Sequence, residues 1–475
     1  MDSFLKRETS SGGNQKTFTV SAWVKLQNRV GSHTIFSSDV EDDGSNYGSL
    51  SIEGTGLVKY INNMGGSLTT NYQSTRLLLD SSSWYHIVLR VDTTQSTASD
   101  RIRLYVNNEQ LTVWDYSTTP NQNTDTGVFK SGNATLIGAR HSTSSHNYWS
   151  GEMTHIHIVD GTSYAPTTFG ETDSTTGEWK PKTTVSVTYG TNGAFLKFEN
   201  SGALGTDSSG NSNTFTVSGS LKQLVDTPTN NFPVFDIQQH QWNDKIHYGG
   251  YGLLSYANSY NSANLTQMVK NGKWYFEVKS ATDNTGENYG ISFYKNGTRS
   301  AYSGYAYQGG SAIQGRQTAG GLDPQGWSYF PNRTSGGSPY FLVATSSTNY
   351  GTQASANDII MVAVDLSTTN IKIWLGRNGT WFNAPGTSDV GNPASGTNVG
   401  YSGSKGDDFW GIAISSSDNE ANNSTKYTYI NMGNGFFGTT AVASANADGA
   451  GVGIFEYAVP SGFYAICSSN IKTYG

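Results

Sequence analysis

The sequence predicts an all-β protein made of two antiparallel β-sandwiches that an ordered connector joins. Apolar residues recur with period 2 along most of the chain, and helix-period patterns are nearly absent. One hairpin pattern occurs once in each half, and 56 glycines together with abundant Ser, Thr and Asn supply turns. A chain of 475 residues exceeds one ordinary core. We therefore expect sandwiches at 1–165 and 241–475, with the connector at 166–240.

Strands of the first sandwich follow from this alternation. FTVSAWVKL (18–26) places Phe18 and Val20 on one face, with Thr19 and the following alternate residues on the other. WYHIVLRVD (84–92) and IRLYVNN (102–108) predict an antiparallel hairpin, and MTHIHIVDG (153–161) predicts a further strand.

The second half repeats the hairpin pattern. MVAVDLSTTNIKIWLGRNGTWF (361–382) has an apolar strand, an Asp, a Ser/Thr turn and a returning strand. Its Asp365 corresponds to Asp92 of the first copy. Because an Asp at a strand end hydrogen-bonds the backbone of its own turn, both positions should define a hairpin register.

The connector is interrupted by prolines but still contains a strand candidate. Its prolines are Pro166, Pro181, Pro228 and Pro233. Proline removes a ladder donor, so continuous sheet is excluded here. AFLKFEN (194–200) predicts a strand that packs on the first sandwich.

The charge, the hydrophobic content and the single cysteine argue against several classes of function. The net charge is −7 and no stretch is strongly basic, which argues against nucleic-acid binding. No segment is long and apolar enough for membrane insertion, and MDSFLKRETSSGG lacks the apolar run of a signal peptide. Cys467 is the only cysteine, so we expect an inert core thiol and synthesis in a reducing cytoplasm.

Several segments resemble known families. The first hairpin with HIHIVDG resembles laminin-G-like, concanavalin-type jelly rolls, and GKWYFEVKS (272–280) with 358–379 is similar to their SPRY-like branch. The run IVDGTSYAPTTFGETDSTTGEWKPK with DSSGNSNTFT, and the ending 453–471, resemble structural proteins of marine tailed bacteriophages. The resemblance implies two concanavalin-like jelly rolls, location in the virion, and other virion proteins as partners.

This resemblance implies a non-enzymatic virion surface protein of the tail-fibre or adhesin type. Its ligand would be a host-surface glycan or receptor, and we expect a homo-oligomer because weak sites gain avidity through multivalency. An alternative is a capsid decoration or head-fibre protein that binds other virion proteins. A weaker one is a polysaccharide-degrading enzyme. The first sandwich strand begins close to Met1, so no standard anchoring module is recognised.

FGETDSTTGEWKPK (169–182) tests the enzyme alternative. Glu171 and Asp173 have the alternate spacing of a retaining glycosidase pair, and Glu178 lies nearby. Their neighbours are Gly, Ser and Thr, with no apolar alternation to orient or desolvate an acid. We expect a solvated turn, in which Trp179 holds the connector against the sandwich.

Two segments are candidates for metal binding. SSDVEDDGSNYG (37–48) offers Asp39, Asp42 and Asp43 to Ca²⁺, without EF-hand spacing. His155 and His157 share a strand face, as in some Zn sites, with His141 and His146 at uncertain distance. The alternatives are a solvated loop and an outward polar face, and no other cofactor is expected.

NMGNGFFG (431–438) matches G-x-G-x-x-G through Gly433, Gly435 and Gly438. A dinucleotide site also needs a following helix, and the loop TTAVASANADGAGVG follows instead. Nucleotide binding is therefore not expected.

The most suggestive candidate ligand site is a long aromatic insertion at 296–340. Its rings could stack on sugars, and polar side chains could orient them. A neighbour interface and packing of the loop on its own domain are alternatives. The candidate residues are Tyr302, Tyr305, Tyr307, Trp327, Tyr329, Arg316, Asp323 and Asn332.

Overall fold

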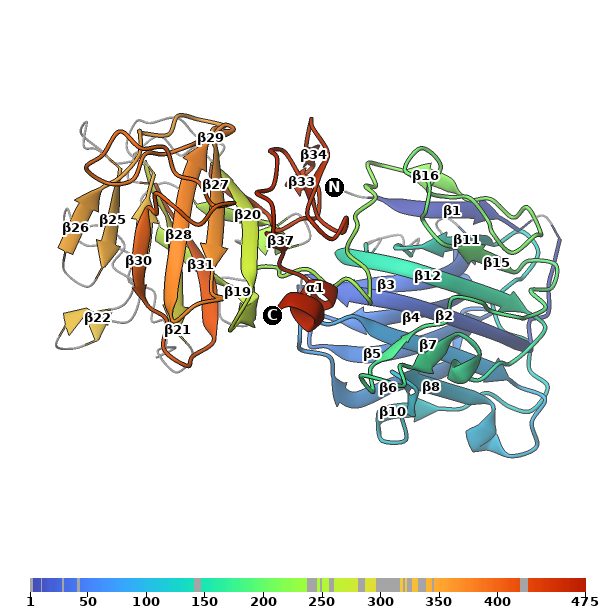
Figure 1. The fold of residues 1–475 in the computed structure, drawn as a ribbon. Helices are drawn as coiled ribbons and strands as arrows, with labels where there is room; N and C mark the ends of the chain where they lie inside the picture. Colours follow the sequence, from blue (N-terminus) through green and yellow to red (C-terminus); the bar gives the residue numbers. More distant parts are fainter. Residues whose placement is uncertain are drawn as a thin grey trace. The chain divides into compact units, whose positions relative to one another are not determined.

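The chain divides into two compact units, Met1–Gln223 and Leu224–Gly475 (Figure 1). The structure is a computed structural model. It describes residues 3–9, 11–27, 30–40, 43–140, 147–236, 246–247, 250–255, 260–280, 287–295, 317–318, 321–322, 327–331, 339–343, 346–418 and 426–475.

In its described residues, unit 1 contains two antiparallel sheets packed face to face. Sheet A runs in the order β10 (Trp114–Thr118), β6 (Ser67–Leu77), β5 (Leu57–Met64), β4 (Asp43–Glu53), β3 (Ser32–Val40), β11 (Ala134–Ile137), β1 (Phe4–Glu8), β16 (Thr216–Ser218). Sheet B runs in the order β15 (Ala194–Leu196), β12 (Gly151–Asp160), β2 (Thr17–Leu26), β7 (Tyr85–Asp92), β8 (Ile102–Val106), β9 (Glu109–Gln110). Two 3₁₀ turns, η1 (Ala98–Asp100) and η2 (Pro166–Thr168), and the ribbon of β13 (Gly170–Thr172) with β14 (Trp179–Pro181) complete the unit.

The core of unit 1 lies between the sheets and follows the predicted alternation. Phe18 and Val20 of β2 meet Leu50 and Tyr60 of sheet A in one buried cluster. The predicted hairpin forms as β7 and β8, with Leu89 opposite Leu104. Asp92 accepts hydrogen bonds from the backbone and hydroxyl of Thr94, as the turn prediction requires.

The connector belongs largely to unit 1. Its strand candidate forms β15, which pairs with β12, and β16 pairs with β1. The expected boundary at 240 is corrected to 223/224, because Phe232, Val234 and Phe235 are buried in the core of unit 2. A boundary inside the connector separates side chains that fill two different cores.

Unit 2 also contains two sheets in its described residues. Sheet F runs in the order β17 (Ile246–His247), β18 (Gly252–Ser255), β32 (Lys426–Asn431), β20 (Lys273–Ser280), β27 (Ile359–Asp365), β28 (Asn370–Arg377), β29 (Thr380–Trp381), with β30 (Tyr401–Ser404) on β28 and β37 (Tyr464–Ala465) parallel to β20. Sheet G runs in the order β19 (Tyr260–Val269), β31 (Trp410–Asp418), β21 (Glu287–Lys295), β24 (Trp327–Phe330), β25 (Tyr340–Val343), β26 (Ser346–Asn349). Short ribbons are β22 (Gln317–Thr318) with β23 (Gly321–Leu322), β33 (Phe436–Phe437) with β34 (Thr440–Ala441), and β35 (Asn446–Ala447) with β36 (Ile454–Phe455).

The repeated hairpin is confirmed as β27 and β28. Asp365 accepts hydrogen bonds from the backbone and hydroxyl of Ser367, as Asp92 does from Thr94 in unit 1. The all-β fold with two separate antiparallel sheet regions is therefore confirmed, and both hairpins close their turns with the same Asp chemistry.

The C-terminal segment covers the outer face of sheet F. Tyr275 and Glu277 alternate along β20 with Trp274 and Phe276, so they lie on the other face of the strand, where the Tyr275 ring packs 4.9 Å from Phe455 of the C-terminal segment. The Glu277 carboxylate accepts backbone hydrogen bonds from Glu456 at 3.0 Å and from Tyr457 at 2.9 Å. Burial raises the pKa of Glu277 to about 7, although these donors oppose that shift. Glu277 thus anchors the segment to the sheet.

The described residues contain one α-helix, α1 (Ser468–Tyr474), of 7 residues. Among them, no helix has the length and apolarity needed to cross a membrane.

Candidate functional site

Polar side chains line the outer face of sheet A in three cross-strand rows. Directly opposed residues of antiparallel strands point to the same face. The first row is Thr34, Ser51, Lys59, Gln73 and Tyr116. The second is Ser37, Ser49, Ile61, Asn71 and Thr118, and the third is Tyr47, Asn63 and Leu68. These outward side chains are called the polar face below.

Strand alternation explains why they gather there. Leu50, Ile52, Tyr60 and Tyr72 occupy the intervening positions and belong to the core of unit 1. Because strand side chains alternate with period 2, the residues between them must face away from sheet B.

Access to the polar face increases toward β10. Ser37 and Ser49, on β3 and β4, are buried. Tyr116, at the other end of the first row, has an exposed fraction of 56%. The Gln73 amide donates to the carboxylate of Asp115 at 2.8 Å. The face is therefore most accessible over β5, β6 and β10.

The third row carries an aromatic ring with polar groups around it. The guanidinium carbon of Arg140 lies 3.9 Å from the ring centroid of Tyr47, a cation–π contact. The side-chain amide oxygens of Asn63 in this row and of Asn71 in the second row are buried and accept no hydrogen bond from the described residues. Buried polar atoms normally have partners, so these oxygens are suited to accept hydrogen bonds from a ligand hydroxyl.

The predicted aromatic site is only partly visible. Six of its residues lie outside the described residues: Tyr302, Tyr305, Tyr307, Arg316, Asp323 and Asn332. Trp327 lies in β24, where its backbone pairs with β21 and β25.

Tyr329 belongs to the core. It is fully buried, its hydroxyl donates to the Tyr350 carbonyl at 3.3 Å, and its ring lies 5.3 Å from that of Phe341. The expectation that Tyr329 presents a surface for sugar stacking is therefore corrected. Its ring packs against aromatic neighbours inside unit 2.

The calcium candidates are described in part. Asp42 lies outside the described residues, and Asp43 begins β4, with its backbone opposite Val40. Asp39 is buried, and its carboxylate accepts a hydrogen bond from the Ser37 hydroxyl at 3.3 Å. Among the described residues, no group of three His, Cys, Asp or Glu side chains is arranged to hold a metal. Calcium binding stays a prediction.

The two histidines of β12 have separate partners. His157 shares a hydrogen bond of 2.8 Å with the Tyr189 hydroxyl, and its ring stacks on Phe195 at 3.9 Å. His155 has a φ of +46° at an irregularity in the pairing of β12 with β2. The expectation that these histidines form an outward polar face is corrected, because the connector buries His157. Desolvation lowers the pKa of His157 well below its usual value.

The clustered carboxylates of 169–182 lie in the turn between β13 and β14. Asp173 accepts hydrogen bonds from the backbone N–H groups of Thr175 and Thr176, both at 2.9 Å, and from Lys180 at 2.8 Å. These donors hold the pKa of Asp173 well below its usual range. A carboxylate held ionised in an exposed turn is unsuited to general-acid chemistry.

Trp179 does hold this hairpin against sheet B. Its indole N–H donates to Nδ1 of His86 at 3.0 Å, so Nε2 of His86 carries the proton and donates to Ser21 Oγ at 2.8 Å. Trp23 stacks on the same imidazole at 4.7 Å. Burial lowers the pKa of His86 to about 3. The connector is thus attached to the sandwich through a neutral histidine.

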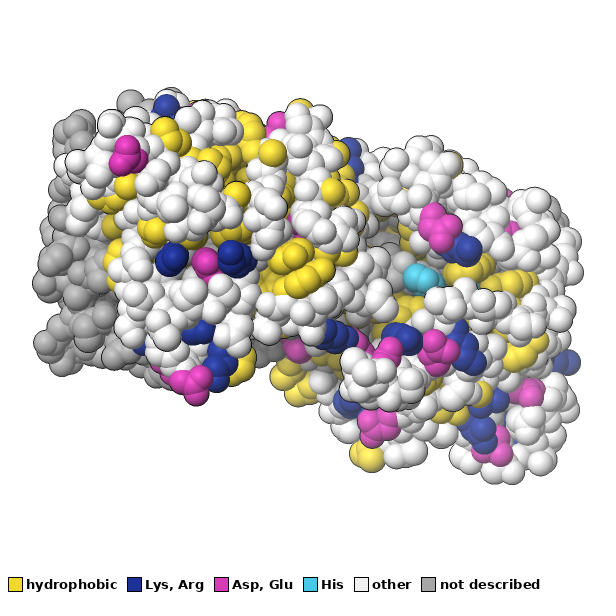
Figure 2. Space-filling view, in the orientation of Figure 1, with side chains coloured by type: hydrophobic (Ala, Val, Ile, Leu, Met, Phe, Trp, Pro, Cys, Tyr) yellow, Lys and Arg dark blue, Asp and Glu magenta, His cyan; other side chains and the backbone are white. Residues whose placement is uncertain are grey.

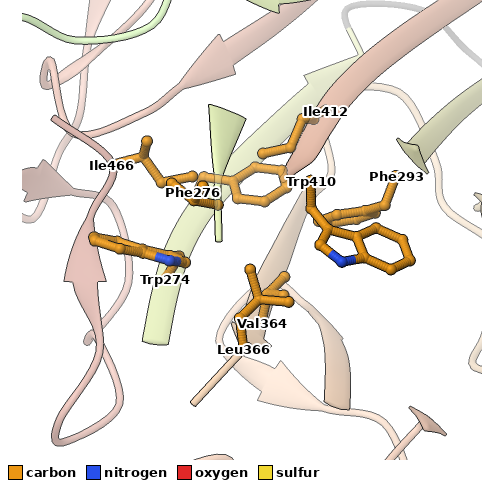
Figure 3. Close-up of a pocket in the computed structure, with 9 residues that line it drawn as sticks. Trp274, Phe276, Phe293, Val364, Leu366, Trp410, Ile412 and Ile466 are labelled. Atoms are coloured by element: carbon orange, nitrogen blue, oxygen red, sulfur yellow. The ribbon is translucent and has the colours of Figure 1, made fainter. Parts of the chain in front are cut away.

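An apolar cavity in unit 2 is a poor ligand site. It is about 10 Å³ in volume, about the space of one water molecule, and only apolar side chains line it (Figure 3). Trp274, Phe276 and Phe293 lie around it, and all three belong to the core of unit 2. It is best understood as a packing defect.

Two other sequence candidates are structural. Gly433 and Gly435 donate their N–H groups to the side-chain oxygen of Asn431, in a loop that leads into β33 and not into a helix. Cys467 is buried, and burial raises the pKa of its thiol.

Figure 2 shows Lys and Arg interspersed with Asp and Glu over the visible described surface. Among these described side chains no basic stripe of the kind that nucleic-acid binding requires is seen on that face.

Residues 6–165 match the family model described as the concanavalin A-like lectin/glucanases superfamily. The match covers the laminin-G-like part of unit 1 and about a third of the chain. No curated protein matches this sequence.

Solved structures with similar folds include a Ruminococcus gnavus IT-sialidase CBM40 bound to alpha2,3 sialyllactose, with 14% identity, TM-score 0.24 and coverage of 31% of this chain and 86% of that one. A human SPRY domain has 12% identity, TM-score 0.24, and coverage of 38% and 91%. Tailspike protein 2 of Escherichia coli O157:H7 bacteriophage CAB120 has 12% identity, TM-score 0.25, and coverage of 34% and 22%.

The polar face was missed at the sequence level, although a signal was present. Tyr47, Ser49 and Ser51 alternate with Gly48, Leu50 and Ile52, a half-buried strand pattern. The pattern cannot show that Arg140, which follows β11 and is far from Tyr47 in the sequence, packs on the Tyr47 ring.

Proposed function

We propose that this chain is a non-enzymatic carbohydrate-binding protein of a phage virion surface, and that the polar face of unit 1 meets the glycan. The observation that carries the proposal is the pair of buried, unpartnered amide oxygens of Asn63, the cross-strand partner of Tyr47, and of Asn71 on the neighbouring strand β6. Sugars present hydroxyl donors and flat apolar faces, which such a surface complements.

The family match supports this assignment, because its description names lectins together with glucanases. Binding without hydrolysis is favoured over the glucanase alternative by the hairpin carboxylates. Asp173 is tied to its turn and to Lys180, and Glu171 lies 3.8 Å from the same Lys180. Retaining hydrolysis requires one protonated and one ionised carboxyl facing a shared cleft.

A virion location is supported by the resemblance of 158–182 and 453–471 to phage structural proteins. A location on the tail and a location on the head can be distinguished by microscopy. Immunogold electron microscopy of the phage particle should label the tail or its fibres if the protein is an adhesin. Label over the head would favour capsid decoration instead.

A glycan array tests the binding function directly. The wild-type chain should bind a subset of glycans, and the Asn63→Ala/Asn71→Ala variant should lose at least about tenfold in affinity, because two acceptor groups are removed. Phe409→Ala, which alters an exposed aromatic side chain of unit 2, is the matched control and should bind normally. No reducing sugar should be released from any bound glycan.

Other outcomes would redirect the proposal. A flat array would remove glycan binding. Normal binding by the Asn63/Asn71 variant, together with loss in a Tyr305→Ala/Trp327→Ala variant, would move the site to the 296–340 insertion.

A further inference from the structure

Arg140 differs from every other arginine in the described part of the chain. Among the described residues its guanidinium has no hydrogen-bond or ion-pair partner, and its Nε is buried. The others all donate to oxygen atoms: Arg7 to Asn192, Arg76 to Glu109, Arg90 to Ser163, Arg101 to Gln95, Arg103 to Asp100, and Arg377 to Asp358 and Gln353.

The position of Arg140 is nevertheless well defined. Its guanidinium lies over the Tyr47 ring, and Tyr47 is the direct cross-strand partner of Asn63. A cation and an unpartnered amide acceptor therefore flank the same ring. Stacking on the ring leaves the guanidinium edges as the donors that need acceptors.

Among the described side chains, the contact formed by the Arg140 guanidinium is the cation–π contact with Tyr47. Glu53, the last residue of β4, is paired with Lys59 at 3.7 Å. Asp39 is buried, and its carboxylate accepts a hydrogen bond from the Ser37 hydroxyl at 3.3 Å. A buried N–H donor without an acceptor is costly, and a planar anion with two oxygens is the acceptor that best matches a guanidinium.

We propose that Arg140 makes the polar face selective for acidic saccharides, by binding a carboxylate or sulfate group while Asn63 accepts a hydrogen bond from a neighbouring sugar hydroxyl. This inference rests on the proposed glycan-binding function and specifies its ligand class. The shared chemistry is an oxyanion attached to a sugar ring, and its source is either a uronic acid or a sulfate ester.

An array of matched pairs tests it. Galacturonide oligosaccharides are printed beside their methyl esters, and sulfated galactan oligosaccharides beside unsulfated ones, at physiological ionic strength. The wild-type chain should favour the acidic member of at least one pair by about tenfold, because a charge-assisted hydrogen bond is lost with the neutral member. Which pair shows the preference identifies the carboxylate or the sulfate.

Variants assign the preference to Arg140. Arg140→Gln should remove the preference while neutral glycans still bind, and Arg140→Lys should keep part of it, because lysine has the charge without the planar fork. Arg76→Gln, which breaks the exposed ion pair between Arg76 of sheet A and Glu109 of sheet B, is the matched control and should retain the full preference. Circular dichroism melts check that each variant is folded.

The outcomes separate this inference from the function on which it rests. Equal binding of acidic and neutral members, or an undiminished preference in folded Arg140→Gln, overturns the role of Arg140 and leaves glycan binding intact. Binding of no member overturns both.

Discussion

His86 shows how one side chain links folding to the covering of sheet B. It receives the Trp179 N–H on one ring nitrogen and donates to Ser21 from the other, which requires the neutral form. Desolvation lowers the pKa of His86 to about 3, and the pKa values of His33, His155 and His157 are lowered as well. These residues make unit 1 sensitive to acid.

The sign of this effect follows from proton linkage. Below pH ~6.5 the unfolded chain protonates its histidines, whereas folded His86 stays neutral until about pH 3. The stabilisation present above pH ~6.5 is therefore lost as pH falls, by up to about 1.4 kcal/mol per pH unit for one histidine. His86→Phe should unfold more easily at pH 7 and show a flatter decline between pH 6 and 4, measured by urea unfolding monitored with Trp fluorescence. Parallel pH profiles for both proteins would contradict this.

At the level of elements, the β13–β14 hairpin decides whether the outer face of sheet B is open or covered. Gly170 lies directly beneath the Trp179 indole, where a Cβ atom would collide with the ring. Thr19, Ser21, Trp23 and Lys25 of β2 are all buried, although alternation places them on the outer side. The connector supplies part of this cover through Trp179, and Thr162, which precedes the connector, accepts the Thr19 hydroxyl at its carbonyl.

Trp179→Ala should destabilise unit 1 by about 2–3 kcal/mol, because an indole contact and its hydrogen bond to His86 are both lost. Hydrogen exchange in residues 169–182 should accelerate. Glu171→Gln is the control, since its exposed ion pair with Lys180 contributes no more than about 1 kcal/mol. Equal effects of the two substitutions would show that the hairpin is not held by its tryptophan.

At the level of the whole molecule, two units have separate cores, and the family match ends before the first unit does. Residues 6–165 match the lectin/glucanase model, but unit 1 continues to Gln223. The additional segment contributes β15 and β16 to the two sheets, and Leu196 and Phe215 to the core.

The fragment 1–223 should therefore fold alone into a monomer that retains glycan binding, whereas 1–165 should aggregate or melt at lower temperature. Without the connector, buried side chains such as Trp23 and His157 would face water. Calorimetry and size-exclusion chromatography of the two fragments distinguish them. A 1–165 fragment as stable as 1–223 would show that the connector is dispensable.

Sequence alone determined the strand alternation, the all-β class with two sheet regions, and the turn roles of Asp92 and Asp365. These depend on local periodicity and on contacts within a few residues, which a single chain displays directly. It also indicated that Trp179 holds the connector, because a lone Trp in a solvated turn needs a partner.

Only the tertiary structure decided which polar faces are covered and which remain available. The period-2 pattern marks an inner and an outer face in β2 and in β4 alike. Segments distant in sequence bury the outer face of β2 in sheet B, whereas part of the outer face of sheet A, to which β4 belongs, stays accessible. Tyr329 became a core residue and Arg140 came to lie over Tyr47 for the same reason. Such long-range placement depends on the packing of whole sheets, and no local pattern encodes it.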